Sequence, residues 1–293
     1  MHNANISRGP KHSTSTQTWI ALPLLTLVTV LSGKALLEVL RLALSNQEYT
    51  HLLLIVPVVV AFLILEQTSP SSHPSRLLAC LAASASIGCF LLSRTLPFSL
   101  HLTLQIAAFV VAVWAIIFWT FGVRFFRANL FPMLFLLLLI PWPIKVVENL
   151  TVLLQSGSTS AAYWLFRGFR IPVARQGFVL SLSSMDIFVA EECSGIRSTV
   201  MLLLAALVLG QLFLRSPWRK AALVLAVLPI GILRNGIRIF ILSVLGIYVN
   251  EGWLEGNLHH RGGSVFFVIG LVLIVGLLWS LRRAEAGSPA GSE

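Results

Sequence analysis

A cysteine at the edge of an apolar run is the first candidate for chemistry. Cys193 lies in the segment AEECSGIRSTVMLLL, residues 190–204, after two acidic residues and before a long hydrophobic stretch. A cysteine thiolate is a strong nucleophile, and nearby cations favour its formation. Cys80 and Cys89 lie inside an apolar stretch, as small hydrophobic residues do. An odd total of 3 cysteines without a Cys-x-x-Cys pair disfavours a disulfide framework or a zinc knuckle, so Cys193 is the candidate nucleophile.

Three arginines in or beside apolar stretches are the next candidates. Arg197 follows Cys193 by one helical turn, and Arg234 and Arg238 lie in the stretch ILRNGIRIFIL. An ionisable side chain at membrane depth is costly and indicates function. The alternative is a side chain that snorkels to a lipid head group, which suits Arg197 better than Arg238 because apolar residues flank Arg238 on both sides. An arginine there can stabilise an oxyanion, and Asn235 can orient a side chain or hold the backbone.

Two histidines, His259 and His260, precede the last apolar stretch. A histidine within reach of a cysteine can take or give a proton. Cysteine, arginine and histidine on separate elements predict acyl transfer or peptide cleavage through a thioester, although one cysteine with one histidine is often incidental. The alternative is a zinc site with Cys193, His259 and His260 as ligands. We predict neither a metal nor another cofactor.

Other polar residues have structural explanations. Glu191 and Glu192 are adjacent, and adjacent residues on a strand point to opposite faces, so we expect them to shape the local field or to be solvated. His51 follows Tyr49 at the end of an apolar stretch, which is typical of an interfacial cap with a tyrosine anchor. The segment 141–143, Pro-Trp-Pro, ends another stretch and is predicted to be structural.

The composition places these residues in a membrane. Of 293 residues, 57% are hydrophobic and 11% are charged, whereas about 25% charged residues are typical of soluble domains. The mean hydropathy is +0.88. The net charge of +10 is explained by topology and contact with anionic lipid, since no basic run suggests nucleic acid. We therefore predict an all-α polytopic membrane protein that contacts membrane lipid and binds no nucleic acid.

About eight transmembrane helices are predicted from the apolar stretches. The first is the weakest, because Lys34 and Glu38 interrupt it, and we expect it to be retained rather than removed as a signal peptide. The predicted spans are residues 18–40, 51–66, 77–93, 101–122, 128–147, 196–214, 219–248 and 263–281.

Basic residues set the predicted orientation. Lysine and arginine concentrate in the short loops that share a side with the N-terminus, so the positive-inside rule favours both termini in the cytoplasm. Residues 1–17 and 284–293 are then cytoplasmic tails, residues 18–283 form the transmembrane domain, and residues 148–195 form a long extracytoplasmic segment.

This extracytoplasmic segment is predicted to carry an interfacial amphipathic helix over residues 150–170. One or two short strands over residues 171–190 are then expected to lead to the cysteine. Arg238 lies about 27 Å beyond Lys220 at the rise of a helix, which puts it near the outer surface. The predicted orientation thus brings Cys193, Arg238 and His259 to the same leaflet.

The order of three blocks resembles the exosortase/archaeosortase family of membrane transpeptidases. The blocks are AEECSGIRS at 190–198, RNGIR at 234–238 and HHRGGSVFF at 259–267, and the resemblance covers about residues 40–280. The stretches EYTHLLLIVPVVVAFLILEQ at 48–67 and LLIPWP at 138–143 resemble the family's upstream core.

The resemblance implies roles for the site residues. Cys193 is the nucleophile, Arg238 stabilises the oxyanion or the thiolate, and His259 protonates the leaving amine. His259 is preferred to His260 because its spacing to Gly263 fits the family. Arg234 stands where a small apolar residue is expected, so which arginine acts stays open. The supporting residues are Arg197, Arg234, Asn235 and His260.

Members of this family process secreted proteins that end in a sorting tail, which consists of a short motif, a transmembrane helix and a basic cluster. In bacteria the motif is commonly Pro-Glu-Pro, and the genes often accompany exopolysaccharide production. The resemblance implies a cysteine peptidase or transpeptidase of the bacterial inner membrane, with its site facing the periplasm and an unknown acceptor. The alternatives are a purely hydrolytic protease and a non-enzymatic membrane protein of exopolysaccharide assembly or transport.

Overall fold

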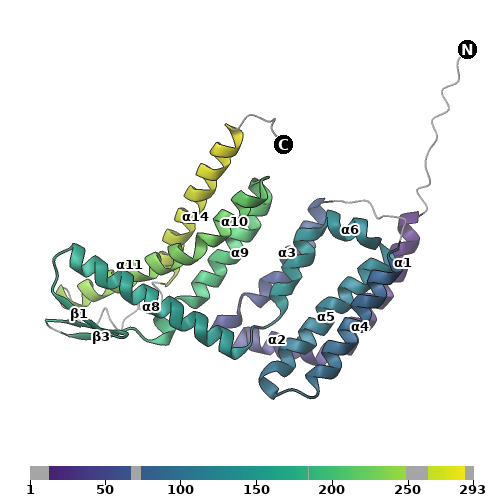
Figure 1. The fold of residues 1–293 in the computed structure, drawn as a ribbon, viewed down its shortest axis with the longest axis horizontal. Coiled ribbons are helices and arrows are strands. Elements are labelled where there is room, and N and C mark those ends of the chain that lie inside the picture. Colours follow the sequence, from purple (N-terminus) through teal and green to yellow (C-terminus); the bar gives the residue numbers. More distant parts are fainter. Residues whose placement is uncertain (1–12, 67–73, 184, 249–262, 288–293) are drawn as a thin grey trace, which may run out of the picture. The chain divides into compact units, whose positions relative to one another are not determined.

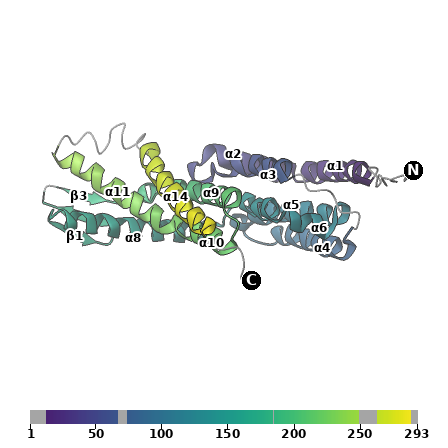
Figure 2. The same ribbon diagram turned by 90° about the horizontal axis from the view of Figure 1, so that it is seen from above.

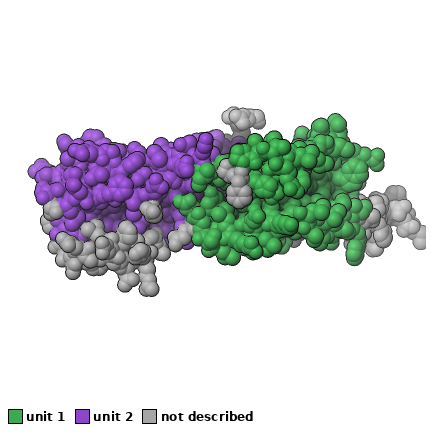
Figure 3. Space-filling view, turned by 90° about the horizontal axis from the view of Figure 1, so that it is seen from below, with its two compact units in different colours: residues 1–144 green, residues 145–293 purple. Residues whose placement is uncertain are grey.

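The computed structural model describes residues 13–66, 74–183, 185–248 and 263–287. His259 and His260 lie outside these residues. The chain divides into two compact units, Met1–Ile144 and Lys145–Glu293, which Figure 3 distinguishes by colour. Helices dominate both units, and a small sheet is present in the second (Figures 1 and 2).

The first unit consists of apolar helices joined by short connections. Its most closely packed pair is α4 and α5, in which the Ser86 hydroxyl on α4 donates a hydrogen bond of 2.8 Å to the carbonyl oxygen of Ala108 on α5 (Figure 1). The elements are α1 (Ser13–Leu31), α2 (Gly33–Ser45), η1 (Gln47–Tyr49), α3 (Leu52–Glu66), α4 (Arg76–Ser93), α5 (Phe98–Thr120), α6 (Gly122–Ala128), α7 (Leu130–Phe135) and η2 (Leu136–Leu139).

Two breaks bend helices of this unit. The chain turns by 68° between Gln17–Leu31 and Gly33–Ser45, and by 83° between Gly122–Ala128 and Leu130–Leu139. The first bend divides the predicted span 18–40. Beyond it, α2 buries one narrow stripe of apolar residues and leaves the charged Lys34 and Glu38 exposed. The predicted single helix is therefore wrong at this point, and a bent pair takes its place.

The predicted span 128–147 covers α7, η2, the Pro-Trp-Pro segment and the start of α8, so it is not one helix, whereas the other predicted spans coincide with apolar helices. Within the described residues, five helices are long and apolar enough to cross a membrane, or up to seven if each bent pair is one span. The stretch 51–66 corresponds to the shorter apolar helix Leu52–Leu65. The all-α polytopic class is thus confirmed, and the predicted number of about eight is reached when the bent pairs and the short helix are each counted as a span.

The residues around His51 form a buried junction. The Tyr49 hydroxyl donates a hydrogen bond of 3.4 Å to the carbonyl oxygen of Trp142, and the His51 and Trp142 rings lie 6.2 Å apart. Both Tyr49 and His51 are buried. The start of α3 is thus packed against the Pro-Trp-Pro segment, which supports the structural interpretation of both motifs.

The second unit contains the candidate nucleophile. Its helices α9, α10, α11 and α14 lie together (Figures 1 and 2). The elements are α8 (Ile144–Gly168), β1 (Val173–Gln176), β2 (Val179–Leu182), β3 (Asp186–Phe188), η3 (Glu191–Cys193), α9 (Ile196–Phe213), α10 (Pro217–Leu225), α11 (Val227–Tyr248) and α14 (Gly263–Ala286).

The segment before the cysteine is more regular than predicted. The expected helix over 150–170 is present as α8 but begins earlier, at Ile144, directly after the Pro-Trp-Pro segment that ends the preceding apolar stretch. Three antiparallel strands in the order β1-β2-β3 replace the expected one or two. Gly177, with φ of +62°, makes the tight turn between β1 and β2, because a residue without a Cβ adopts this conformation without strain.

Close helix packing positions α11. A methyl group placed on Gly236 would lie 2.5 Å from Cβ of Ala161 on α8, and one on Gly157 of α8 would lie 2.8 Å from Cδ1 of Ile232. Small residues let membrane helices approach closely in this way. Two apolar cores complete the unit. One joins α9, α10, α11 and α14 around Leu202, and the other joins α8, the sheet and α11 around Phe166.

Candidate active site

Cys193 is presented on a short connection between the sheet and α9. Val189 ends the strand region by donating its N–H to the carbonyl oxygen of Phe178, at 3.0 Å. The chain then forms the single turn η3, in which the Cys193 N–H donates to the carbonyl oxygen of Ala190, also at 3.0 Å. Helix α9 begins at Ile196, so Cys193 lies beside the positive end of a helix dipole, where an anion is stabilised.

Gly195 allows this sharp entry into the helix. Its φ is +79°, in the left-handed region that other residues adopt only with strain. A Cβ at this position would also lie 2.8 Å from Nη2 of Arg234 and 3.0 Å from Cγ of Asn235. The glycine therefore serves both the backbone turn and the close approach of α11.

Asn235 ties α11 to the nucleophile. Its side-chain amide donates a hydrogen bond of 2.6 Å to the backbone carbonyl oxygen of Cys193, and the residue is 0% exposed. A buried amide that bonds to the main chain fixes the backbone rather than the thiol. Of the two roles predicted for Asn235, to orient a side chain or to hold the backbone, the structure contains the backbone bond.

Arg234 lies beneath the cysteine connection. It is 2% exposed, and a methyl group on Gly270 of α14 would lie 3.1 Å from its Cδ. The side chain is thus enclosed between Gly195 and Gly270. Its Nε atom is buried and has no hydrogen-bond partner among the residues that the structure describes. The two glycines explain how the fold accommodates an arginine where a small residue was expected.

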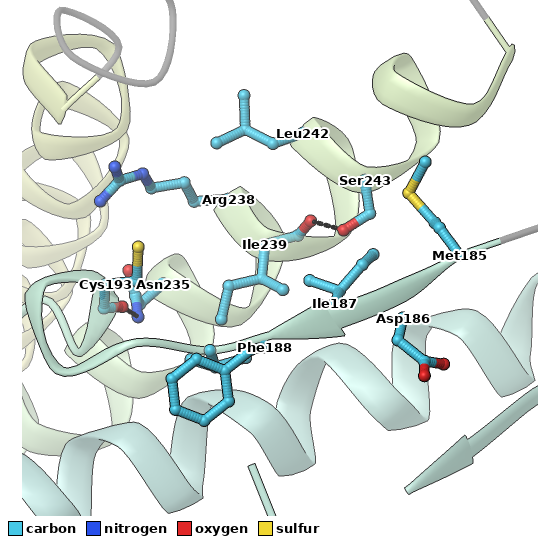
Figure 4. Close-up of a pocket in the computed structure, with 11 residues that line it drawn as sticks. Met185, Asp186, Ile187, Phe188, Cys193, Asn235, Arg238, Ile239, Leu242 and Ser243 are labelled. Carbon is cyan, nitrogen blue, oxygen red and sulfur yellow. Dashed lines mark hydrogen bonds between the residues drawn. The ribbon is translucent and has the colours of Figure 1, made fainter. Parts of the chain in front are cut away.

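Arg238 and Cys193 line the same cavity, which has a volume of about 240 Å³ (Figure 4). Cys193 and the Arg238 guanidinium lie toward the same end of it. Arg238 is half-buried and is one helical turn from Arg234, which lies against Gly195 in the connection that follows the cysteine. The described residues that line the cavity are Met185, Asp186, Ile187, Phe188, Val189, Cys193, Asn235, Arg238, Ile239, Leu242 and Ser243.

The remaining predicted residues fall into two groups. Arg197 is exposed on the first turn of α9 and is not among the described residues that line the cavity. The structure thus brings together Cys193, Arg234, Asn235 and Arg238 but not Arg197. His259 and His260 lie outside the described residues, so their predicted roles, and the zinc alternative that uses them, stay predictions. Within the described ranges, no group of three or more His, Cys, Asp or Glu side chains is arranged to hold a metal.

Two features of the site were not predicted from the sequence. Gln155 of α8 is 2% exposed and donates a hydrogen bond of 2.5 Å to the carbonyl oxygen of Val189, which anchors the connection from β3 to the cysteine. A row of polar residues on one face of α8, which includes Thr151, Gln155 and Thr159, was the available signal. The second unpredicted feature is the apolar wall formed by Ile239 and Leu242. Its available signal was the helical spacing, which places both residues on the same face of the helix as Asn235.

Fold and site together define a polytopic membrane protein with a cysteine held between a small sheet and a membrane helix that carries two arginines. The transmembrane exosortase family (Exosortase_EpsH) matches residues 43–276, so the chain belongs to this family. No curated protein matches the chain, and no solved structure matches it. Membership confirms the resemblance and makes the chain, in general terms, a membrane transpeptidase.

Proposed function

We propose that this exosortase cleaves C-terminal sorting tails of secreted proteins through a thioester on Cys193. The observation that carries the proposal is the shared cavity of Cys193 and Arg238, with the cysteine backbone held by Asn235. A nucleophile that shares a cavity with an arginine matches the needs of acyl transfer, where negative charge develops on the attacked carbonyl oxygen.

The reaction follows from these positions. The Cys193 sulfur attacks the carbonyl carbon of the scissile peptide bond, and the carbonyl oxygen becomes an oxyanion near the Arg238 guanidinium. The C–N bond breaks as His259 gives a proton to the leaving amine, and the acyl group remains on sulfur. An amine or hydroxyl acceptor, or water, then attacks the thioester and gives its proton to the now neutral His259, while the C–S bond breaks and returns the Cys193 thiolate. The substrate's own transmembrane helix docks among the helices and supplies much of the positioning.

The proposed setting is a bacterial inner membrane. Both termini are cytoplasmic, and the segment 148–195 with the active site faces the periplasm. The proposed substrates carry a Pro-Glu-Pro motif before their membrane helix and basic cluster, and the acceptor is an unidentified nucleophile. The support for this orientation is the distribution of basic residues in the short loops.

A substrate-processing assay tests the proposal. The protein is co-expressed with a secreted protein that carries a Pro-Glu-Pro tail, and wild type is compared with Cys193→Ala and Cys193→Ser at equal membrane levels. Cys80→Ala, on the exposed face of α4, is the matched control. We expect wild type and Cys80→Ala to shorten the substrate and both Cys193 variants to leave it full length. Processing by the Cys193 variants would refute the thioester.

Two further outcomes separate the alternatives. Mass spectrometry of the new C-terminus distinguishes transfer, which adds the mass of the acceptor, from hydrolysis, which adds only water. If loss of Cys193 is without effect on exopolysaccharide output while Arg238→Ala abolishes it, the non-enzymatic role in assembly or transport replaces the proposal.

A further inference from the structure

The edge of the small sheet forms one wall of the cavity. Five consecutive residues, 185–189, line it, although successive side chains of a strand point to opposite faces. A cavity that touches residues pointing both ways reaches the edge of β3 as well as the face that carries Ile187. Figure 4 shows Ile187 pointing from β3 toward α11, and Asp186 and Phe188 pointing to the other side of the strand, which leads on to Cys193.

The hydrogen-bond ladder leaves this edge with free backbone groups. Val189 donates its N–H to Phe178, the Leu182 N–H bonds to the carbonyl oxygen of Met185, and Ile187 is paired with Leu180. In an antiparallel ladder, the residues between such pairs direct their N–H and C=O groups away from the partner strand. These residues are Asp186 and Phe188. Among the described residues, no fourth strand pairs with them, because the sheet ends at β3.

The opposite wall makes this edge a favourable place for a peptide backbone. Helix α11 presents Ile239 and Leu242 on the side of the sheet that carries Ile187, so the unpaired groups of β3 lie beside an apolar surface. Unpaired backbone groups beside an apolar surface lose hydrogen bonds to water, so a hydrogen-bonding partner lowers their free energy most. The open edge of a sheet is also a template on which another strand can pair. From Asn235 to Ser243 the helix wall is about 12 Å long, and this length holds three to four residues of extended chain at about 3.3 Å each.

The groove is continuous with the nucleophile. Cys193 and Arg238 lie at one end of the same cavity, and Cys193 follows β3 in the chain (Figure 4). A chain laid along the edge therefore reaches the sulfur with its next carbonyl group. This continuity identifies the occupant as the cleaved segment of the substrate rather than lipid or a second copy of the protein.

We propose that the substrate's cleavage segment binds as an extended strand that adds to the open edge of β3, through the backbone N–H and C=O groups of Asp186 and Phe188. The inference rests on the proposed function. Main-chain bonds align the scissile carbonyl, and side chains that point toward α11 contact Ile239 and Leu242. The substrate class is thus an extended peptide without helical structure at the cleavage point, in which alternate residues are read by the groove.

Proline substitution on the edge tests this inference. Phe188→Pro removes an N–H that makes no bond to β2, and Phe188→Ala keeps the N–H while removing the ring. We expect Phe188→Pro to process the tailed substrate at least about tenfold more slowly than Phe188→Ala, because a donor is lost and the proline ring obstructs the edge. Asp186→Pro against Asp186→Ala repeats the test at the other outward position.

Alkylation of Cys193 by a maleimide, measured without substrate, separates the two proposals. The expected result is an alkylation rate in Phe188→Pro within about twofold of Phe188→Ala, together with the loss of processing. Equal processing by the two variants would overturn strand addition and leave the thioester proposal intact. Processing by Cys193→Ala would instead refute the proposed function.

Disulfide mapping gives a second test that needs no proline. Phe188→Cys is placed in a background of Cys193→Ala, Cys80→Ala and Cys89→Ala, and single cysteines are moved along the substrate segment. An added strand predicts crosslinks at alternate positions, with yields at least about fivefold above those of the positions between, since side chains of a strand alternate. Uniform yields along the segment would overturn the inference.

Discussion

The side-chain amide of Asn235 holds the backbone carbonyl of Cys193 at 2.6 Å, across 42 residues of sequence. This bond joins the nucleophile's connection to the helix that carries Arg234 and Arg238. Because Asn235 is completely buried, its amide cannot exchange this bond for one to water. The position of the cysteine connection relative to the arginines is therefore fixed in part by this amide.

Asn235→Ala is expected to lower processing about tenfold or more, because the Cys193 carbonyl loses its buried donor. The loss of stability is expected to be about 1–3 kcal/mol, from the same unsatisfied group. Asn129→Ala is the matched control, since Asn129 is also buried and donates a hydrogen bond of 2.9 Å to the carbonyl oxygen of Phe125 in the other unit. It should lose stability but keep the Cys193 alkylation rate. An Asn235 variant with wild-type processing would contradict the positioning role.

Gly195→Ala is expected to destabilise the protein and to abolish most processing. The substitution imposes backbone strain of about 1–2 kcal/mol at a positive φ, and its Cβ also collides with Arg234 and Asn235. Gly177→Ala has a similar φ of +62° but meets nothing within 4 Å. Thermal unfolding in detergent should therefore show a clearly larger shift for Gly195→Ala. Equal shifts would mean that the contact with α11 contributes nothing.

Arg238→Ala is expected to reduce the processing rate by about 100-fold to 1000-fold, as the loss of a donor to an oxyanion does. Arg197→Ala is the matched arginine control, since Arg197 is exposed and outside the described cavity lining. It should keep most of the wild-type rate. Single-turnover measurements with saturating substrate decide the point, because they report the chemical step. Equal losses in the two variants would remove the assignment of Arg238 to the oxyanion.

His259→Ala is expected to lower the rate of thioester formation by about 100-fold, since a general acid contributes on this scale. His260→Ala should retain most of the activity if the family's spacing to Gly263 identifies the acting histidine. The acylation step is followed by trapping the Cys193 thioester with hydroxylamine. A larger loss in His260→Ala would exchange the two roles, and unaffected acylation in both would exclude histidine as the acid.

The predicted orientation, with both termini in the cytoplasm, can be tested by labelling single cysteines from one side of the membrane. In a chain without its native cysteines, Asp186→Cys should react with a membrane-impermeant maleimide in intact cells, since residue 186 lies in the predicted extracytoplasmic segment and its side chain is exposed. Trp218→Cys, an exposed position next to basic residues that are predicted to be cytoplasmic, should react only after the membrane is permeabilised. The reverse pattern would invert the topology and place the active site in the cytoplasm.

The sequence by itself determined the class and most of the spans. Each apolar stretch carries its own tendency to enter a bilayer, so a local property is sufficient to locate it. The order of the cysteine, Asn-Gly-x-Arg and histidine blocks likewise indicated the family that the profile match over residues 43–276 confirmed. Local chain chemistry also favoured the helix before the strands, which appears as α8.

Only the tertiary structure decided how these parts meet. The separation of Arg238, on the cavity, from the enclosed Arg234 depends on where α9 and α14 place Gly195 and Gly270. The cavity beside β3 likewise joins segments distant in the chain, residues 185–193 and 235–243. Sequence periodicity reports which face of an element is apolar but not what that face contacts. The site was therefore recognisable by its residues, while its geometry required the fold.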